Sequence, residues 1–266
     1  MTDSILSERR GAVAWLTLNR PQIHNAFDDL LIAALTDALA QAEADPAVHA
    51  LVLSGNGSCF SAGADLNWMR GMASASEQEN REDSLRLARL MRNLQFLSKP
   101  TIARVNGAAY GGGVGLVACC DIAIGVDTAK FALSEVKLGL VPAVISPYVI
   151  AAIGLREARR LFITGEVFDA ATAARIGLLH ATVPAAELDE AIERQLYLLA
   201  KAGPLAQREA KQLALRIGGV ELAHAERIDQ ANAELIARLR VSKEGQHGLS
   251  AFLDKRAPAW VGRAPE

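Results

Sequence analysis

Short apolar runs alternate with longer segments of helical periodicity through the first half of the sequence, and this alternation constrains the fold more than any other feature. The runs are short enough for buried strands, and turn-forming residues follow several of them. They comprise residues 11–19, 48–54, 101–105 and 122–126. Between them, apolar side chains recur at helical spacing in residues 27–45, 77–97 and 111–120. Strands that alternate with helices predict an α/β domain with a largely parallel sheet.

The last third of the sequence is mostly helical in pattern, with one strand-like run at residues 179–183. The expected helices cover residues 155–164, 169–176, 188–201, 205–217, 221–239 and 242–253. The change in pattern places a boundary near Pro184 or near Gly203-Pro204. We therefore expect a core of residues 1–200, which holds the ligand site, followed by a C-terminal helical region of residues 201–266.

Charge and cysteine usage exclude several classes of function. The 266 residues carry 28 Lys+Arg against 30 Asp+Glu, the cations are scattered singly, and 5% of residues are aromatic, so no nucleic-acid partner is expected. The longest uncharged stretch, residues 138–155, is interrupted by prolines and glycines, which favours buried core over a membrane span. Three cysteines and a start without a signal-peptide pattern predict a cytoplasmic protein without disulfides. A small molecule is the expected ligand.

The first candidate site is the stretch of small residues from Ser58 to Leu66. If a helix begins at Asp65, the amide of Ala64 belongs to the unpaired donors that attract an anion or a polarised carbonyl oxygen. The alternative is an ordinary loop between a strand and a helix.

The second candidate site is rich in glycine, with five glycines in the nine positions from Gly107 to Gly115. Backbone can approach a ligand closely there, so the amide of Gly112 is a second donor, and two donors from separate loops can form an oxyanion hole. Residues 113–118 also match the dinucleotide pattern G-x-G-x-x-A, but the acidic residue expected about 20 positions later is missing. We therefore expect no nicotinamide or flavin cofactor.

The third candidate is Glu135, which has apolar residues on both sides. Burial would raise the pKa of its carboxyl toward neutrality, which suits proton transfer at a carbon next to a carbonyl. A solvent-facing position or an ion pair with Lys137 is the structural alternative. The five histidines show no metal-binding spacing, so no metal site is expected.

In their order and spacing, these motifs resemble the enoyl-CoA hydratase/isomerase (crotonase) family over nearly the whole chain. The matching stretches are residues 19–21, 25–26, 60–66, 106–113, 120–121, 134–135, 138–142, 173–178 and 252–256. The resemblance implies a crotonase-like spiral of ββα repeats in place of one plain parallel sheet. It also implies a C-terminal helical trimerisation region, and therefore a homotrimer or a hexamer made of two trimers.

The resemblance further implies an acyl-CoA thioester as substrate and no separate cofactor, because CoA is part of that substrate. The amides of Ala64 and Gly112 would hold the thioester oxygen as an enolate forms, and Glu135 would transfer the proton. The residues implied in binding the CoA portion are His24, Ala26, Ala62, Ala64, Asp65, Leu66, Phe252 and Lys255, of which the last two would reach the nucleotide end across a subunit boundary.

One departure from the family pattern bears on activity. Family hydratases carry two catalytic glutamates; the second aligns with Glu135, whereas the first falls at Gly115. A lone carboxylate can still move a proton between two carbons, as it does in the isomerases of the family. A Δ3,Δ2-enoyl-CoA isomerase and a non-catalytic acyl-CoA binder therefore stay open beside an enoyl-CoA hydratase.

Two longer stretches, residues 60–69 and 133–147, look like those of bacterial methylglutaconyl-CoA hydratases of leucine breakdown and of their isohexenylglutaconyl-CoA relatives. Many members of that branch lack the first glutamate too. The branch implies a branched substrate of the 3-methylglutaconyl type, whose distal carboxylate needs a nearby cation. Arg70, Arg81 and Lys137 are the candidates for it.

Overall fold

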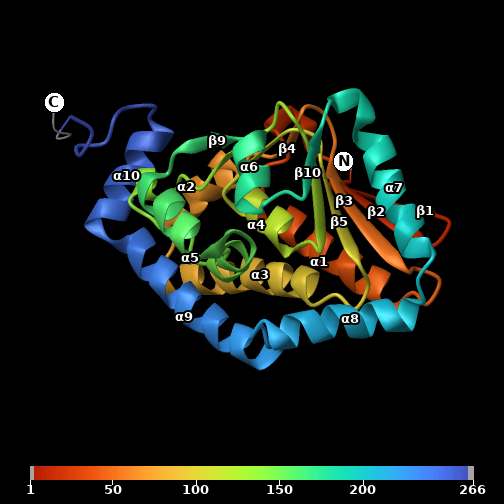
Figure 1. Ribbon diagram of the computed structural model, residues 1–266. Coiled ribbons are helices and arrows are strands. Elements are labelled where there is room, and N and C mark those ends of the chain that lie inside the picture. The colour runs from red at the N-terminus through yellow and green to blue at the C-terminus, as the bar shows by residue number, and fades with distance from the viewer. Residues whose placement is uncertain (1–2, 263–266) are drawn as a thin grey trace.

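Residues 3–262, which the computed structural model describes, form two sheets covered by helices (Figure 1). The larger sheet contains, in spatial order, β1 (Ile5–Arg10), β2 (Val13–Leu18), β3 (Ala50–Gly55), β5 (Thr101–Val105), β7 (Ile122–Val126) and β10 (Ala181–Val183). The smaller contains β4 (Cys59–Ser61), β6 (Ala108–Tyr110), β8 (Lys130–Ala132) and β9 (Val167–Asp169). Within this described part, β1-β2 and β8-β9 pair antiparallel and the other neighbours pair parallel.

Ten α-helices and three short 3-10 helices connect and cover the strands of residues 3–262. The α-helices are α1 (Asp29–Ala44), α2 (Leu66–Ser74), α3 (Glu77–Gln95), α4 (Gly112–Cys119), α5 (Ser146–Thr164), α6 (Ala170–Ile176), α7 (Leu188–Ala200), α8 (Pro204–Ile217), α9 (Leu222–Val241) and α10 (Lys243–Leu253). The 3-10 helices are η1 (Pro21–Ile23), η2 (Glu135–Leu138) and η3 (Ala185–Glu187).

The chain winds through the two sheets in a repeating strand–strand–helix pattern. Strands β3, β5 and β7 lie side by side in the larger sheet, and the strand that follows each of them lies in the smaller sheet. The expected spiral of ββα units is thereby confirmed, and the single parallel sheet predicted from the apolar runs alone is wrong. The strands of the smaller sheet have only three residues each, so no apolar run of strand length marks them.

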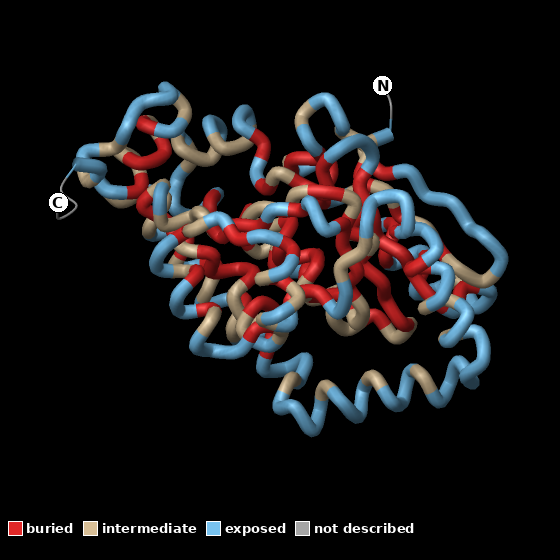
Figure 2. Tube along the Cα trace, turned by 45° about the horizontal axis from the view of Figure 1, so that its top comes forward, coloured by how far each residue is buried: buried red, intermediate tan, exposed pale blue. Residues whose placement is uncertain are grey.

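Local sequence explains the central helices. Ser76 caps α3 through a capping box with Glu79, and the apolar stripe of α3 buries Leu90, Met91 and Leu94 against the core. All six residues of β3 are buried, as expected for a strand covered on both faces. Buried backbone is concentrated in the strands and the helices next to them, whereas α8 has no buried residue (Figure 2).

The C-terminal helices return to the core of their own chain. Helix α9 packs along α3, where Arg92 pairs with the buried Asp229, and α10 packs against η2 and α2 (Figure 1). Helix α8 contacts the core through an ion pair, in which Nζ of Lys211 lies 2.8 Å from Oδ2 of Asp121. Trimerisation through this region stays a prediction. Within residues 3–262, no helix has both the length and the apolarity that a membrane crossing requires.

Candidate active site

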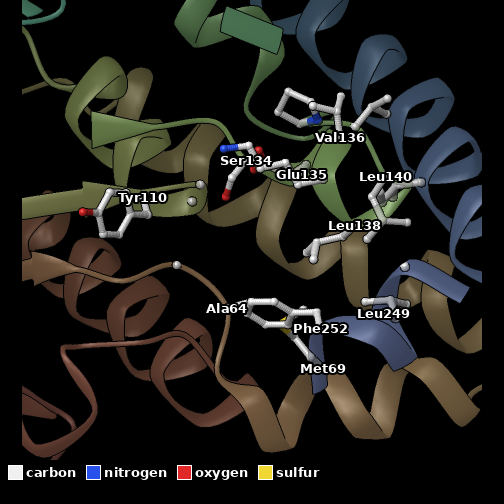
Figure 3. Close-up of a pocket in the computed structure, with 18 of the residues that line it drawn as sticks. Ala64, Met69, Tyr110, Ser134, Glu135, Val136, Leu138, Leu140, Leu249 and Phe252 are labelled. Carbon is white, nitrogen blue, oxygen red and sulfur yellow. The ribbon is translucent and has the colours of Figure 1, made fainter. Parts of the chain in front are cut away.

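Three parallel strands of the smaller sheet bring the three candidate residues together. Because β4, β6 and β8 are parallel neighbours, their carboxyl ends lie at the same edge of the sheet. Ala64 follows β4, Gly112 follows β6 and Glu135 follows β8. All three line one cavity of about 730 Å³, and Figure 3 shows Ala64 and Glu135 on opposite sides of it.

The amide of Ala64 is free for a structural reason that differs from the one predicted. Helix α2 begins at Leu66 with Asp65 as its N-cap, so Ala64 lies outside the helix. Instead, Ala64 forms an isolated parallel bridge with Phe27, whose N–H donates to Gly63 O and whose carbonyl accepts from Asp65 N. Since successive peptides of an extended chain point to opposite sides, the N–H of Ala64 points away from Phe27. It has no hydrogen-bond partner within the described residues.

The amide of Gly112 is the first of helix α4 and therefore has no partner within the helix. The ring of Phe27 packs tightly against it: a Cβ on Gly112 would lie 2.4 Å from Cε2 of Phe27. The loops that carry the two amides also touch, because a Cβ on Gly63 would lie 3.0 Å from Tyr110 O. The two amides thus come from adjoining loops and open on the same cavity, which is the arrangement that an oxyanion hole requires.

The carboxyl group of Glu135 lies directly beside the donor loop of β6. A Cβ on Gly111 would stand 3.1 Å from Oε1 of Glu135. The Oε2 atom is buried and has no hydrogen-bond partner within the described residues. Burial raises the pKa of Glu135 to about 7, while a backbone hydrogen bond acts in the opposite direction. A carboxyl group with a pKa near neutrality is suited to proton transfer, and this one lies next to the predicted oxyanion donors.

The rest of the cavity wall is mainly apolar. Figure 3 shows Met69, Leu138, Leu140, Leu249 and Phe252 around the space that faces Glu135. They come from α2, η2 and α10 and from the chain between η2 and α5, so residues of both predicted parts of the chain line the cavity. Such a wall makes the surroundings of the carboxyl group weakly polar and suits an acyl chain.

Gly115 lies outside this lining, in the buried first turns of α4. A Cβ at position 115 would stand 2.3 Å from Cγ2 of Ile145 and 3.2 Å from Cε of Met91. Ile145 itself lines the cavity. The place where family hydratases carry their first glutamate is therefore filled by apolar side chains.

The residues expected to bind the CoA portion are less closely grouped. Ala62, Ala64 and Phe252 line the cavity, whereas the lining does not include His24, Ala26, Asp65, Leu66 or Lys255. His24, Leu66 and Lys255 are exposed. The carbonyl oxygen of His24 accepts a hydrogen bond from the backbone N–H of Ala62. Ala26 is buried, and Asp65 caps α2 and pairs with Arg20, which gives both a structural role. Phe252 lines the cavity of its own chain, so a contact across a subunit boundary stays a prediction.

A buried polar network that the sequence analysis missed holds the first donor loop. The fully buried Asn25 donates from Nδ2 to Asn56 O and Cys59 O, and its Oδ1 accepts from Arg20 N. Ser61 then donates from Oγ to Asn25 O. These bonds fix the chain around Ala64 from both sides. Asn25 also has a left-handed backbone with φ of 55°, which asparagine tolerates better than most residues.

Two further lining residues, Trp68 and Arg240, were not predicted. The signal for Arg240 lies in the spacing of α9, where the buried positions Ala225, Asp229, Ala233 and Ile236 continue to residue 240. A charged residue on the buried stripe of a helix is unusual and marks a specific contact. Of the cations proposed for a distal carboxylate, Lys137 lines the cavity, whereas Arg70 and Arg81 do not belong to its lining.

Comparisons with known proteins agree with this geometry. A family model with the description "Enoyl-CoA hydratase/isomerase" matches residues 8–263. The chain is similar to 2,3-dehydroadipyl-CoA hydratase of Escherichia coli K12, with 35% identity over 267 residues that cover 99% of this chain and 100% of that protein. It is 31% identical to crotonyl-CoA hydratase of Syntrophomonas wolfei over 263 residues, 98% of this chain and 99% of that protein. Among solved structures, an enoyl-CoA hydratase from Shewanella pealeana shares 43% identity at a TM-score of 0.79, covering 97% of this chain and 96% of that chain.

Proposed function

The chain belongs to the enoyl-CoA hydratase/isomerase family, and we propose that it is a hydratase that adds water across the α,β double bond of an acyl-CoA thioester. One observation carries the proposal: two free backbone amides and a buried carboxyl group follow three adjacent parallel strands and open on one cavity. Amide donors stabilise a developing oxyanion, and the carboxyl group supplies the proton transfer that completes the addition.

In the proposed reaction, the thioester oxygen is held by the N–H groups of Ala64 and Gly112. Water attacks C3 of the double bond, and the electron pair of that bond moves toward the thioester oxygen, which becomes an enolate oxygen. Glu135 then gives its proton to C2 and takes up the proton that the added water releases. The product is a 3-hydroxyacyl-CoA, and the carboxyl group returns to its starting state. Nucleophilic addition of water and two proton transfers account for every step, so the proposal includes no separate cofactor.

For the acyl group, we propose a branched chain of the 3-methylglutaconyl type. The cavity wall is apolar enough for a branched chain, and the lining also includes a largely buried cation, Arg240, that an unsubstituted fatty acyl chain does not need. The names of the relatives include both kinds of acyl group, because one is named for a dicarboxylyl thioester and another for crotonyl-CoA. Both kinds of substrate therefore belong in the test.

For the CoA portion and for assembly, the earlier expectations are kept as proposals. Phe252 is partly exposed at the cavity and Lys255 lies close behind it in the chain, so we propose both as contacts of the nucleotide end. Exposed apolar side chains of α7 and α8, including Leu198, Leu205 and Ile217, support a subunit interface in a homotrimer or hexamer. Light scattering on the purified protein tests this assembly, and a monomer at assay concentration would contradict it.

A Δ3,Δ2-enoyl-CoA isomerase is the second candidate, and the filled space at Gly115 favours it. With Ile145 and Met91 in that space, Glu135 is the only carboxyl group that lines the cavity within the described residues. One carboxyl group is sufficient to carry a proton from C2 to C4 without adding water. Incubation with a 3-enoyl-CoA in deuterated water distinguishes the two reactions, because the isomerase gives a 2-enoyl product with no net hydration.

The direct test follows the loss of enoyl thioester absorbance with crotonyl-CoA and with 3-methylglutaconyl-CoA, for the wild-type protein and for Glu135→Gln. Hydration of either substrate that Glu135→Gln abolishes supports the proposal. No hydration of either substrate contradicts it and leaves the isomerase for the deuterium experiment. A protein that binds both thioesters without turning over any of them, and that binds them equally well as Glu135→Gln, would be a non-catalytic binder.

A further inference from the structure

The cavity contains one cation that is shielded from solvent. Of the described residues that line it, three are cations, namely Lys137, Arg240 and Arg256. Lys137 and Arg256 are exposed, whereas the side chain of Arg240 is only 14% exposed. A positive charge in an apolar wall is costly unless an anion accompanies it, so its partners decide what it does there.

Arg240 is only partly satisfied by the protein. Its Nη1 atom donates to Oδ2 of Asp83 at 3.2 Å and to Oδ1 of Asn80 at 3.1 Å. Within residues 3–262, Nε and Nη2 make no hydrogen bond to the protein. Asp83 is fully buried and also accepts from Arg86 at 3.2 Å. Two guanidinium groups thus share one carboxylate, and the Nε and Nη2 atoms of Arg240 stay available to an anion in the cavity.

A second unsatisfied donor lies next to this charge. Trp68 lines the cavity, and its Nε1 atom is buried without a hydrogen-bond partner in the described structure. The guanidinium carbon of Arg240 lies 5.8 Å from the centre of the Trp68 ring, so the two side chains are neighbours. A buried N–H group without a partner is unfavourable in a folded protein, and an acceptor in the cavity would satisfy it.

The position of Trp68 indicates which part of a ligand would reach this pair. Trp68 lies in the first turn of α2, which begins two residues after Ala64. Leu66 to Trp68 rise only about 3 Å along the helix axis. The distal carboxyl carbon of a five-carbon diacid lies about 5 Å from its thioester carbon. A thioester oxygen at Ala64 and a distal carboxylate near Trp68 are therefore compatible in scale.

We propose that Arg240 and the indole N–H of Trp68 bind the distal carboxylate of a short dicarboxylyl-CoA substrate, and that Arg240 determines the specificity for it. This inference rests on the proposed function, because it places the acyl chain between the oxyanion donors and Arg240. The guanidinium atoms Nε and Nη2 can offer a carboxylate a paired contact, and the apolar surroundings strengthen it. A phosphate of CoA is the other anion that the substrate could place here, and the experiment separates the two.

The test compares two substrates that differ only in the carboxylate, 3-methylglutaconyl-CoA and 3-methylcrotonyl-CoA. We expect the wild type to have the higher kcat/KM with the diacid. Arg240→Met should lower kcat/KM for the diacid by about 10- to 100-fold more than for the monoacid, the range expected for loss of a charge-assisted contact. Trp68→Phe should reduce the same preference by a smaller factor, and Arg240→Lys should retain part of it.

Arg86→Met is the matched control. Arg86 binds the same Asp83, but its side chain is 52% exposed and it is not among the residues lining the cavity. Its loss should therefore leave the preference for the diacid unchanged. If Arg240→Met does not fold because Asp83 loses a partner, the double variant Asp83→Asn/Arg240→Met is used in its place, because it removes both charges of the pair.

Binding of saturated thioesters keeps the inference independent of turnover. Calorimetry with 3-methylglutaryl-CoA, isovaleryl-CoA and free CoA gives the contribution of the carboxylate even if the protein does not hydrate anything. Weaker binding of the diacid alone in Arg240→Met supports the inference. Equal weakening of all three ligands would assign Arg240 to a CoA phosphate or to the fold and would overturn it, as would a wild type that does not distinguish the two acyl groups.

Discussion

The ring of Phe27 lies against the backbone of Gly112 so closely that a Cβ on this glycine would stand 2.4 Å from Cε2. Phe27 is fully buried, and its own backbone forms the bridge that turns the amide of Ala64 toward the cavity. One residue therefore contacts both proposed oxyanion donors, the first through its peptide group and the second through its ring. Because the ring occupies the space of a side chain at position 112, a variant with a smaller residue at position 27 allows the effect of that side chain to be measured separately from the effect of the Gly112 N–H group.

The first prediction uses Phe27→Leu as a background that makes room at position 112. In that background, Gly112→Ala keeps the amide and should retain most of the activity, whereas Gly112→Pro adds a Cβ at the same place and removes the N–H. Proline is tolerated at the first position of a helix, so both variants should fold. We expect Gly112→Pro to have a kcat lower by about 10²–10³-fold than Gly112→Ala. Equal kcat values for the two variants would exclude Gly112 as an oxyanion donor.

The second prediction concerns the pH dependence of catalysis. Burial raises the pKa of Glu135 to about 7. If the protonated carboxyl group gives its proton to C2, kcat/KM should be constant below this pH and fall about tenfold per pH unit above it. The buried Cys120 thiol cannot produce the same decrease in kcat/KM above pH 7, because burial raises its pKa to about 12. Steady-state rates from pH 5.5 to 9 are the measurement, and a profile that is flat through pH 7 to 9 would argue against this role.

The third prediction concerns stability, because the same group destabilises the fold once it is charged. The pKa of Glu135 is about 7 in the folded protein against an ordinary value of 4.5, so its neutral form favours folding below pH 4.5 and this contribution is lost as the pH rises through 7. Glu135→Gln keeps the neutral form at every pH. Its free energy of unfolding should therefore exceed that of the wild type by on the order of 3 kcal/mol at pH 8, and by much less near pH 5.

Denaturant unfolding at several pH values measures this difference. The exposed Glu187→Gln is the control, because it removes a carboxyl group without changing the cavity. A constant difference between Glu135→Gln and the wild type from pH 5 to 8 would mean that the carboxyl group is not desolvated in the folded state.

Much of the fold follows from patterns that the sequence displays directly. The predicted strand at residues 101–105 and the predicted helix from residue 77 agree with β5 and α3, because each has an apolar pattern of sufficient length. The N-terminal strand β1 was not predicted, since five of its six residues are exposed and it is held mainly by pairing with β2. Tertiary pairing, rather than the local pattern, forms that strand.

The candidate site was predictable to a similar degree. Ala64, Gly112 and Glu135 were selected from local composition, and topology brings them together because each follows a strand of the same sheet. Arg240 could not be linked to them, since it lies more than 100 residues beyond Glu135 and its contact with Trp68 exists only once α9 has folded back on α3. Long-range docking of a helix leaves no local signal apart from a charge on its buried face.

The fourth prediction tests whether a second catalytic carboxylate can be introduced. A Cβ at position 115 would overlap Cγ2 of Ile145 at 2.3 Å, so Gly115→Glu alone should destabilise the protein by about 1–3 kcal/mol and lower its activity. Adding Ile145→Ala removes the closest overlapping atom, Cγ2, and leaves Cβ of residue 145 at 2.9 Å, a smaller overlap beside a smaller apolar wall. The double variant should recover much of the stability and place a carboxyl group beside the cavity, within reach of a water molecule.

Two measurements separate the effects of this change. Thermal unfolding reports whether Ile145→Ala relieves the overlap, with Ile145→Ala alone as the reference. The ratio of hydration to double-bond migration on a 3-enoyl-CoA then reports the chemistry, because a second carboxylate that holds water should favour hydration. If the stable double variant hydrates no faster than Ile145→Ala, the absence of the first glutamate does not determine the ratio of hydration to double-bond migration in the wild-type protein. Glu135 and the two amides then determine this ratio without a second acid.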